Sequence, residues 1–280
     1  MLWENLRSEE FHDAIEQCNG VCVIPIGCVE AHGVHLPLGC DAMLAKEFAT
    51  RAAEREPVCV FPPIYFGEKN GAGEHPGTII FPLTLIWEIL EQCCKEIARN
   101  GFRKILIYDT HGGNTSMLDA FVRHYLRNKP DHLVCHYFHG LPDLRDILAA
   151  PEQYSYLTGE DRQILQDFVD QKKAGGHGCF IETGCLYDIC PELIRLDRID
   201  AVSGKSTGTF DGFIRRGINT PFNWQGNYPN SYTADIHYGM NERIARAIGE
   251  RSVEITAEVF RFLREETDSE KFLRQWHAKQ

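Results

Sequence analysis

The sequence predicts an α/β fold: a three-layer α/β/α sandwich in which helices cover both faces of a mainly parallel sheet. Short apolar runs with strand character alternate along the chain with longer amphipathic segments. Strand, loop and helix repeat in this order, which is typical of a parallel sheet with helical crossovers. The 280 residues are 43% hydrophobic, enough for a substantial core. Because we find no internal repeat and no convincing linker, we expect residues 1–280 to form one domain.

The expected elements follow one another from residue 21 onward. Each strand is a short apolar run, and each helix has apolar residues at helical spacing. The expected strands are Val21–Ile26, Val58–Phe61, Lys104–Tyr108 and Leu133–Phe138. The expected helices are Asp41 to about Glu56, Leu83–Asn100 with Gly101 as its stop, Ser116–Arg127 and Asp235–Arg264.

Two stretches depart from this alternation. Residues 141–173 are polar and helical in character, and we expect a partly exposed insertion there. Residues 203–233 are rich in Gly, Asn, Thr and aromatic residues and show little periodicity. A loop this long in a compact domain is usually functional or covered by a partner subunit.

Composition and charge exclude several classes of protein. The formal net charge of −11 argues against a general nucleic-acid-binding surface. The N-terminus lacks the features of a signal peptide, and no apolar run approaches the ~20 residues that span a bilayer. We therefore expect a cytoplasmic protein without a membrane partner. The eleven cysteines form no CxxC pair and are expected to be reduced and buried. A local role stays open for those that flank the motifs below, namely Cys28, Cys40, Cys179 and Cys185.

The densest group of chemically active residues directly follows the first expected strand. In α/β sheets, ligands bind beyond the carboxyl ends of the strands. Glu30 and His32 would point to the same side of an extended chain, because alternate residues share a face. A carboxylate and an imidazole so placed suit zinc, manganese or iron. Asp41 returns after two glycine-bounded turns and could bridge two ions.

Each of these residues also has a simpler structural interpretation. Asp41 begins an expected helix and could be its N-cap. Glu30 could pair with an arginine, and His35 could be a packed histidine. Three potential ligands within twelve residues at a strand end outweigh these separate alternatives, so the segment predicts a metal site.

A second motif, Asp-Thr-His-Gly-Gly-Asn, spans residues 109–114 and again follows a strand. We expect His111 to be a metal ligand. Gly112 and Gly113 let the backbone approach a substrate closely, and their amides could face a developing anion. An ordinary strand-to-helix turn is the alternative.

Two further motifs complete the set of candidate site residues. In the segment from residue 175 to 183, Glu182 could be a ligand or a proton shuttle, and His177 a general acid or base. Their structural alternatives are a carboxylate at a helix start and a loop histidine. His75, in the segment from residue 73 to 78, could form a wall of the pocket, with a structural turn as an equal alternative.

These four segments, in this order, resemble the creatininase (creatinine amidohydrolase) family. The family pattern G-x-x-E-x-H-G-x-H-L-P-L-x-x-D matches Gly27 to Asp41 without a gap. The family's H-G-G-N matches His111 to Asn114. Its H-x-G-x-x-E-T-like and H-P-G-T-like segments correspond to His177–Thr183 and His75–Thr78.

The resemblance implies a creatininase-like α/β/α sandwich that assembles as a homo-oligomer, commonly a hexamer, and binds one or two divalent ions. Zinc is favoured, with manganese or iron as alternatives. The implied ligands are Glu30, His32, Asp41 and His111, with Asp41 between the ions. Creatininase has a glutamate ligand where this chain has Gly113. One ion is therefore better supported than two, and Glu182 is the candidate to fill the gap.

This chain departs from creatininase in the residues expected to contact the substrate. Creatininase covers the flat creatinine ring with tryptophans before the His177 motif, whereas residues 141–174 of this chain contain none. Creatinine is therefore not the favoured substrate. The aromatic, amide-rich segment 224–232 suits a hydroxylated ring, with Trp224 and Asn227 as candidate substrate contacts. A subunit-contact loop is the alternative.

We therefore expect a hydrolase in which a metal-activated water attacks a carbonyl carbon of a small substrate, with a cyclic one favoured. Backbone amides near Gly112 and Gly113 would stabilise the oxyanion, and His177 or Glu182 would protonate the leaving atom. A nitrogen leaving atom makes the enzyme an amidohydrolase of a cyclic amide or formamide, which the family favours. A carbon leaving atom makes it a C–C hydrolase that opens a cyclic ketone such as a keto-inositol. A non-catalytic metal-binding or sugar-binding protein is the alternative from another class.

Overall fold

The computed structural model, which describes residues 1–171, 175–233 and 239–278, has the expected α/β/α architecture. Its sheet contains four strands in the order β2-β1-β3-β4, and every neighbouring pair is parallel. The strands are β1 (Val21–Ile26), β2 (Cys59–Val60), β3 (Lys104–Asp109) and β4 (Leu133–Phe138). The two central strands, β1 and β3, are buried along their whole length.

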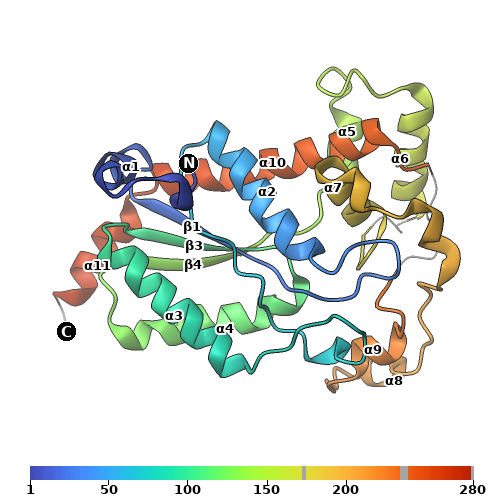
Figure 1. The fold of residues 1–280 in the computed structure, drawn as a ribbon, viewed down its shortest axis with the longest axis horizontal. Coiled ribbons are helices and arrows are strands. Elements are labelled where there is room, and N and C mark those ends of the chain that lie inside the picture. Colours follow the sequence, from blue (N-terminus) through green and yellow to red (C-terminus); the bar gives the residue numbers. More distant parts are fainter. Residues whose placement is uncertain (172–174, 234–238, 279–280) are drawn as a thin grey trace.

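Helices cover both faces of this sheet (Figure 1). Among the described residues they are α1 (Phe11–Gln17), α2 (Cys40–Arg55), α3 (Leu83–Arg99), α4 (Thr115–Tyr125), α5 (Leu144–Ala149), α6 (Gly159–Gln171), α7 (Phe180–Ile189), α8 (Asp211–Ile214), α9 (Asn223–Asn227), α10 (Glu242–Glu265) and α11 (Asp268–His277). The carboxyl ends of β1 and β3 point toward the side of the molecule where α7, α8 and α9 lie (Figure 1). These helices therefore surround the edge of the sheet at which ligands are expected.

The core is divided by the sheet into two clusters, because successive strand residues point to opposite faces. Val23 and Leu106 belong to the cluster that includes residues of α2, α7 and α10. Ile24 and Ile107 belong to the cluster that includes residues of α3 and α4. Burial on both faces explains why the strands are apolar at consecutive positions.

Most of the predicted elements are confirmed, with small shifts at their ends. The strands β1 and β4 have the predicted bounds, whereas β2 is two residues long and shorter than expected. The helix α3 ends at Arg99, just before the predicted stop. The helix α4 ends at Tyr125, and a 3₁₀ turn over Leu126–Asn128 continues it to Lys129, whose positive φ of 47° stops the helix.

The helical character of residues 141–173 is confirmed by two helices, α5 and α6, although residues 172 and 173 lie outside the described part of the chain. Two other predictions need correction. The expected loop of residues 203–233 contains the short helices α8 and α9. The last long helix, α10, begins at Glu242 because the Asn241 side chain accepts hydrogen bonds from the first-turn amides of Arg243 and Ile244. The predicted start at residues 235–238 lies outside the described residues.

The helix α7 was not predicted, for a physical reason. It is buried without interruption from Phe180 to Leu186, so its sequence has no polar face to reveal a helical period. α7 packs against both α2 and α10. It therefore delivers its first turn, which contains Glu182, to the edge of the sheet.

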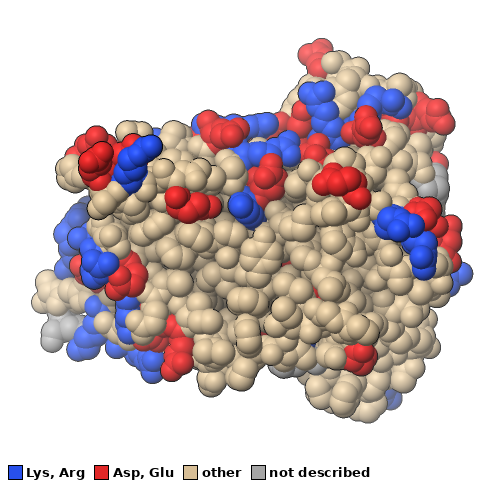
Figure 2. Space-filling view, in the orientation of Figure 1, with Lys and Arg blue, Asp and Glu red and all other residues tan. Residues whose placement is uncertain are grey.

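The surface and the cysteines agree with the composition. Among the described residues, no helix combines the length and apolarity that a membrane crossing needs. Figure 2 shows acidic and basic side chains interspersed along the α5–α6 edge and around the α1–α11 end, while the middle of this face is largely uncharged. All eleven cysteines are free, and only Cys93 and Cys135 are partly exposed, as expected for reduced thiols.

Candidate metal centre

A close approach between the end of β1 and the start of α2 brings the first ligands together. A Cβ atom on Gly27 would lie 2.3 Å from the backbone nitrogen of Ala42, so only glycine allows this approach. Gly39, and not Asp41, is the N-cap residue of α2, and Asp41 lies in the first turn. The N-cap interpretation of Asp41 is therefore wrong. Its carboxylate is free to face the loop that carries Glu30 and His32.

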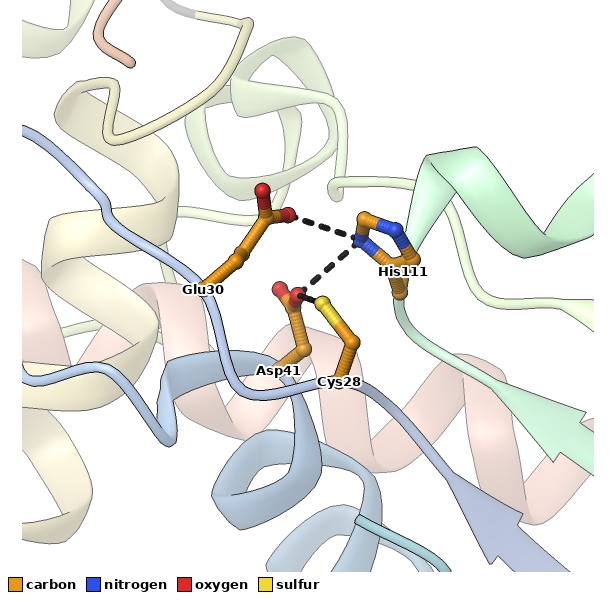
Figure 3. A group of neighbouring side chains, drawn as sticks. All are labelled: Cys28, Glu30, Asp41 and His111. Atoms are coloured by element: carbon orange, nitrogen blue, oxygen red, sulfur yellow. Dashed lines mark hydrogen bonds and ion pairs between the residues drawn. The ribbon is translucent and has the colours of Figure 1, made fainter. Parts of the chain in front are cut away.

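The first group of potential ligands surrounds His111 (Figure 3). Its Nδ1 atom lies 3.0 Å from Oε1 of Glu30 and 3.0 Å from Oδ2 of Asp41. The thiol of Cys28 is 3.1 Å from the same Asp41 oxygen. Figure 3 shows that these side chains converge from the loop after β1, the start of α2 and the loop after β3.

A second group shares Asp41 with the first. Nε2 of His32 lies 3.2 Å from Oδ1 of Asp41 and 3.8 Å from Oε1 of Glu182. In each group the potential ligand atoms lie within 4.8 Å of one another. The two Asp41 oxygens thus face two different histidines, which is the arrangement of a bridging carboxylate. Glu182 joins His32 and Asp41 in this second group.

Backbone carbonyls fix the orientation of both histidines. Nε2 of His111 donates to the Glu68 carbonyl at 2.9 Å, and Nδ1 of His32 donates to the Glu30 carbonyl at 3.1 Å. In the neutral form of each ring, the other nitrogen then carries no proton. This nitrogen is Nδ1 in His111 and Nε2 in His32, and it faces the carboxylates. A ligating histidine is usually held in this way by a second hydrogen bond. Carboxylate and imidazole donors together form a set that suits zinc, manganese or iron.

The electrostatics of the cluster favour a bound cation. Burial lowers the pKa of His32, but the carboxylates of Asp41 and Glu182 outweigh burial and raise it to about 10. Burial opposes ionisation of Asp41, but His32 and His111 hold the pKa of this carboxyl well below its usual range. Burial raises the pKa of Glu182 to about 7. The protein thus concentrates buried carboxylates that need positive charge beside them.

The turn that carries His111 is held by Asp109 and Asn114. Oδ1 of Asp109 accepts hydrogen bonds from the His111 amide at 3.0 Å and from the Asn114 side chain at 2.9 Å. Oδ1 of Asn114 accepts from the Glu68 amide at 2.7 Å. His136 of β4 lies 3.5 Å from the other oxygen of Asp109. This network fixes the position of the turn that carries His111.

Gly113 is required by the position of the His111 ring. A Cβ atom at residue 113 would lie 2.4 Å from Nε2 of His111 and 3.1 Å from the Glu68 carbonyl oxygen. A side chain there would break the hydrogen bond between these two groups. The glutamate that creatininase has at this position and the present orientation of His111 therefore exclude each other.

The ligand cluster opens into a cavity of about 830 Å³. Asp41, His111, His177 and Glu182 form part of its wall. The rest of the lining includes Gly112 and Gly113, the apolar side chains of Phe138 and Leu141, and Trp224 and Gln225 of α9. A cavity of this size with a few convergent polar groups is typical of a site for a small molecule.

Two predicted residues lie in this cavity as expected. His177 stacks on His32, with ring centroids 4.0 Å apart, and burial followed by the charge of His32 lowers its pKa to about 3. Its Nε2 donates to the Ala31 carbonyl at 2.8 Å. Trp224 packs edge-on against His177, with ring centroids 5.0 Å apart. His177 and Trp224 thus form adjacent parts of one wall.

Two other predicted substrate contacts lie elsewhere. His75 does not line the cavity, but its ring nitrogen is 2.9 Å from the side-chain nitrogen of Gln225, which does. The Asn227 side chain is used inside the segment 203–233, where it donates to Asp211 and accepts from the Phe210 amide. His35 also lies away from the cavity, and its Nε2 is 3.0 Å from the Gly178 carbonyl. These three side chains shape the surroundings of the site.

Two cavity residues escaped the sequence analysis. Lys69 lies beside Glu30, and His139 follows the carboxyl end of β4. Neither ring nitrogen of His139 has a hydrogen-bond partner among the described residues, and burial lowers its pKa to about 4. The sequence could have pointed to His139, because it directly follows an expected strand. Lys69 had no such signal, because only the folded chain brings it to Glu30.

Comparison with known proteins identifies the family. A family model described as creatininase, creatinine amidohydrolase, matches residues 4–261. The creatinine amidohydrolase of Pseudomonas putida is 24% identical over 202 residues, which are 69% of this chain and 74% of that protein. A mycofactocin precursor peptide peptidase of Mycolicibacterium smegmatis is 32% identical over 111 residues, 36% of this chain and 42% of that protein. The 3-dehydro-scyllo-inosose hydrolase of Thermotoga maritima is 26% identical over 114 residues, 40% of this chain and 36% of that protein.

Solved creatininase structures have the same fold. A manganese form of creatininase has a TM-score of 0.70 and 20% sequence identity, and the match covers 95% of this chain and 99% of that chain. A zinc–zinc form of a mutant creatininase also has a TM-score of 0.70 at 20% identity, with 95% and 98% of the two chains covered. At this level of identity the likeness shows the fold alone.

The family match and the buried ligand cluster define the class: the protein is a metal-dependent hydrolase that uses a divalent ion. More particularly, the chain belongs to the creatininase family.

Proposed function

We propose that this protein is an amidohydrolase that binds two divalent ions and cleaves a C–N bond of a small cyclic amide or a formamide. The observation that carries the proposal is the pair of ligand groups that share Asp41 at the wall of the cavity. The sequence favoured one ion, because Gly113 replaces an expected ligand. The nearness of Glu182 to His32 and Asp41 supports two ions instead.

The donors of the two groups suit zinc or manganese. Glu30, Asp41 and His111 would hold one ion, with Cys28 close by. His32, Asp41 and Glu182 would hold the other. When bound, a divalent ion supplies a Lewis acid for the carbonyl group and lowers the pKa of a coordinated water from about 15.7 toward about 7.

The other cavity residues have roles that follow from their contacts. Because Nε2 of His177 donates to Ala31, its Nδ1 atom is left to accept a proton and pass it to the leaving nitrogen. Gly112 and Gly113 border the cavity, where their amides can face the developing oxyanion. Trp224 offers a flat apolar surface to a ring.

Cleavage of a C–C bond in a cyclic ketone is the second candidate reaction. It is supported by the likeness to the inosose hydrolase of Thermotoga maritima, which covers 40% of this chain. The two reactions share the attack on a carbonyl carbon and differ in the leaving atom. Product analysis therefore separates them. The amidohydrolase gives a ring-opened product with a new carboxylate and a freed nitrogen group from a cyclic amide, or formate and an amine from a formamide, whereas the C–C hydrolase gives a new carboxylate and a new C–H bond.

Metal analysis of the purified protein tests the ligand cluster. We expect close to two equivalents of zinc or manganese in the wild type. Asp41→Ala should lose both the metal and turnover, because it removes the shared ligand. Asp197→Ala, an exposed aspartate paired with Arg195, is the matched control and should behave as wild type. Less than about 0.2 equivalents in the wild type, without rescue by added zinc, manganese or iron, would contradict the proposal.

A hydrolysis screen of the metal-loaded protein tests the substrate class. The screen contains creatinine, other cyclic amides, formamides and keto-inositols. We expect turnover of a cyclic amide or formamide and little of creatinine. Turnover of keto-inositols alone would replace the amidohydrolase by the C–C hydrolase. Metal retention without any turnover would favour a metal-binding protein that lacks catalysis.

A further inference from the structure

Lys69 is a cavity residue with an unusual pair of neighbours. Its side chain is 12% exposed, and its ammonium nitrogen lies 2.5 Å from Oε2 of Glu30. The same nitrogen lies 4.5 Å from the centre of the Trp224 ring. The ammonium thus stands between a fully buried candidate metal ligand and the aromatic wall of the cavity.

The backbone before Lys69 is tied to the metal centre. The Glu68 amide donates to Asn114, and the Glu68 carbonyl accepts from the ring of His111. A Cβ atom on Gly67 would lie 2.4 Å from the Asn114 side-chain oxygen, so the chain passes this point in close contact. The backbone next to Lys69 is therefore held close to His111 and Asn114.

The ion pair and a bound metal ion compete for the same carboxylate. Glu30 belongs to two of the three groups of potential ligands, and its Oε2 atom now faces the ammonium. A divalent cation at Glu30 would repel Lys69 and take its partner. The ammonium already faces the Trp224 ring, which would keep it on the cavity side after Glu30 is taken.

The charge of the cavity suggests what the displaced ammonium binds. Among the described residues that line the cavity, Lys69 is the only lysine or arginine. With the carboxylates engaged by metal, its charge would be left without an anionic partner beside an apolar wall. Such a group recognises an anion.

We propose that Lys69 is an exchangeable counter-ion: it neutralises Glu30 while no metal is bound, and with metal bound it positions a substrate through the substrate's carboxylate. This inference rests on the metal ligation proposed above. It narrows the substrate class to cyclic amides or formamides that carry an anionic group.

The first test measures metal affinity and needs no substrate. Lys69→Met removes the competing cation, so we expect zinc to bind at least about tenfold more tightly. The metal-free variant should melt at a lower temperature than the wild type, because the buried Glu30 carboxylate loses its lysine partner, and zinc should restore the melting temperature. Lys95→Met, which removes the lysine of an exposed pair with Glu91, is the matched control and should change neither property.

Lys69→Arg keeps the positive charge and changes the shape of the side chain, so it shows which of the two affects zinc binding. Its zinc affinity should stay within about threefold of the wild-type value. If the metal-free Lys69→Met protein does not fold, the zinc-loaded form is purified and the rate of zinc release to a chelator is compared instead, with slower release expected. Zinc binding or release equal to that of the wild type in Lys69→Met would overturn the counter-ion role.

The second test uses acetate and acetamide, which have the same shape and differ in charge, as probes of the zinc-loaded protein. Titration followed by ligand NMR should show acetate binding about tenfold more weakly to Lys69→Met than to the wild type, with acetamide unchanged. An equal effect on both probes, or on neither, would overturn the carboxylate role. Both tests read binding, so they can succeed even if the hydrolysis screen fails. A failure of metal binding itself would instead reject the proposed function.

Discussion

At the scale of single residues, the metal centre depends on a position that has no side chain. Gly113 leaves room for the hydrogen bond between His111 and Glu68, and this bond directs Nδ1 of His111 at Glu30 and Asp41. The neighbouring Gly112 could be replaced without a clash, because a Cβ atom there would make an ordinary contact of 3.8 Å with Phe138. The two glycines of one motif thus differ in what they permit.

Substitution of these glycines tests the difference. Gly113→Ala should weaken metal binding by about 10- to 100-fold, because the new methyl group displaces the His111 ring from its second hydrogen bond. Gly112→Ala is the matched control and should retain the metal of the wild type. Metal content after dialysis and a zinc titration measure the effect. Equal metal affinity in the two variants would show that His111 is not oriented in this way.

His139 makes a prediction about pH and stability. Its pKa is about 4 in the folded protein, below the ordinary value of 6.5, because burial disfavours the charged ring. Between these pH values the unfolded chain binds a proton that the folded chain does not, so stability falls as pH drops from 6.5 to 4. Over this whole pH range, the titration of His139 lowers the free energy of unfolding by about 3 kcal/mol.

The variant His139→Phe should lose this part of the pH dependence of stability. Urea unfolding in the presence of a chelator should show a shallower fall of the free energy of unfolding below pH 6.5 than in the wild type. At neutral pH the variant should be no less stable, because the replaced imidazole has no hydrogen-bond partner among the described residues. His12→Phe, at an exposed site, is the control. An unchanged pH dependence in His139→Phe would contradict the assignment.

At the scale of elements, the close packing of α7 against α10 places Glu182. A Cβ atom on Gly184 of α7 would lie 2.7 Å from the side chain of Ile248 in α10. On the other side of the contact, a Cβ atom on Gly249 would lie 2.2 Å from the carboxylate of Asp188. The absence of side chains at these glycines lets the two helices approach. The second ligand group therefore depends on a contact between α7 and α10, a helix that supplies none of the candidate ligands.

Gly184→Val should separate α7 from α10. We expect a loss of about 1–3 kcal/mol in the free energy of unfolding from overpacking, together with weaker binding of the ion held by Glu182. Gly159→Val is the control, because no atom lies within 4 Å of a Cβ atom at this first residue of α6. Chemical denaturation and metal titration measure both effects. A stability loss with unchanged metal binding would show that Glu182 is positioned independently of this contact.

How well each helix or strand could be predicted depended on how it is buried. The strand β1 and the helix α3 were predicted nearly to the residue, because one is apolar throughout and the other has a clear apolar face. The helix α7 escaped because it is buried on all sides. The start of α10 was misplaced because it is set by the cap at Asn241 and not by the apolar period.

At the scale of the whole molecule, the metal centre joins segments that are far apart in the chain. Glu30 and Asp41 come from the region after β1, His111 from the loop after β3, and Glu182 from α7. A bound ion therefore links α2 and α7 to the loops that follow β1 and β3. Binding to the folded state alone stabilises that state by mass action.

Removal of metal should lower the stability of the entire protein. At a free metal concentration about 100 times the dissociation constant, the contribution is about 2.7 kcal/mol. Calorimetry with and without a chelator should show a lower melting temperature for the metal-free wild type. Asp41→Ala should melt at the same temperature in both conditions. A wild-type melting temperature that does not respond to the chelator would contradict a resident metal ion.

Assembly is a separate property of the whole molecule. The homo-oligomer, a hexamer by family resemblance, stays a prediction. A mass in solution of six times 31.9 kDa, measured by light scattering, would support it, and a mass of one chain would reject it.

The sequence by itself determined the fold class and pointed to most of the candidate ligands. These are local properties: strands and helices follow from apolar periodicity, and Glu30, His32, Asp41 and His111 stand in motifs that follow strands. The tertiary structure decided what depends on distance between segments. It brought Glu182 to His32 and Asp41, placed Lys69 and His139 in the cavity, and put the side chain of Asn227 outside it. These contacts depend on how helices and loops pack across the sheet edge, and no short stretch of sequence records that packing.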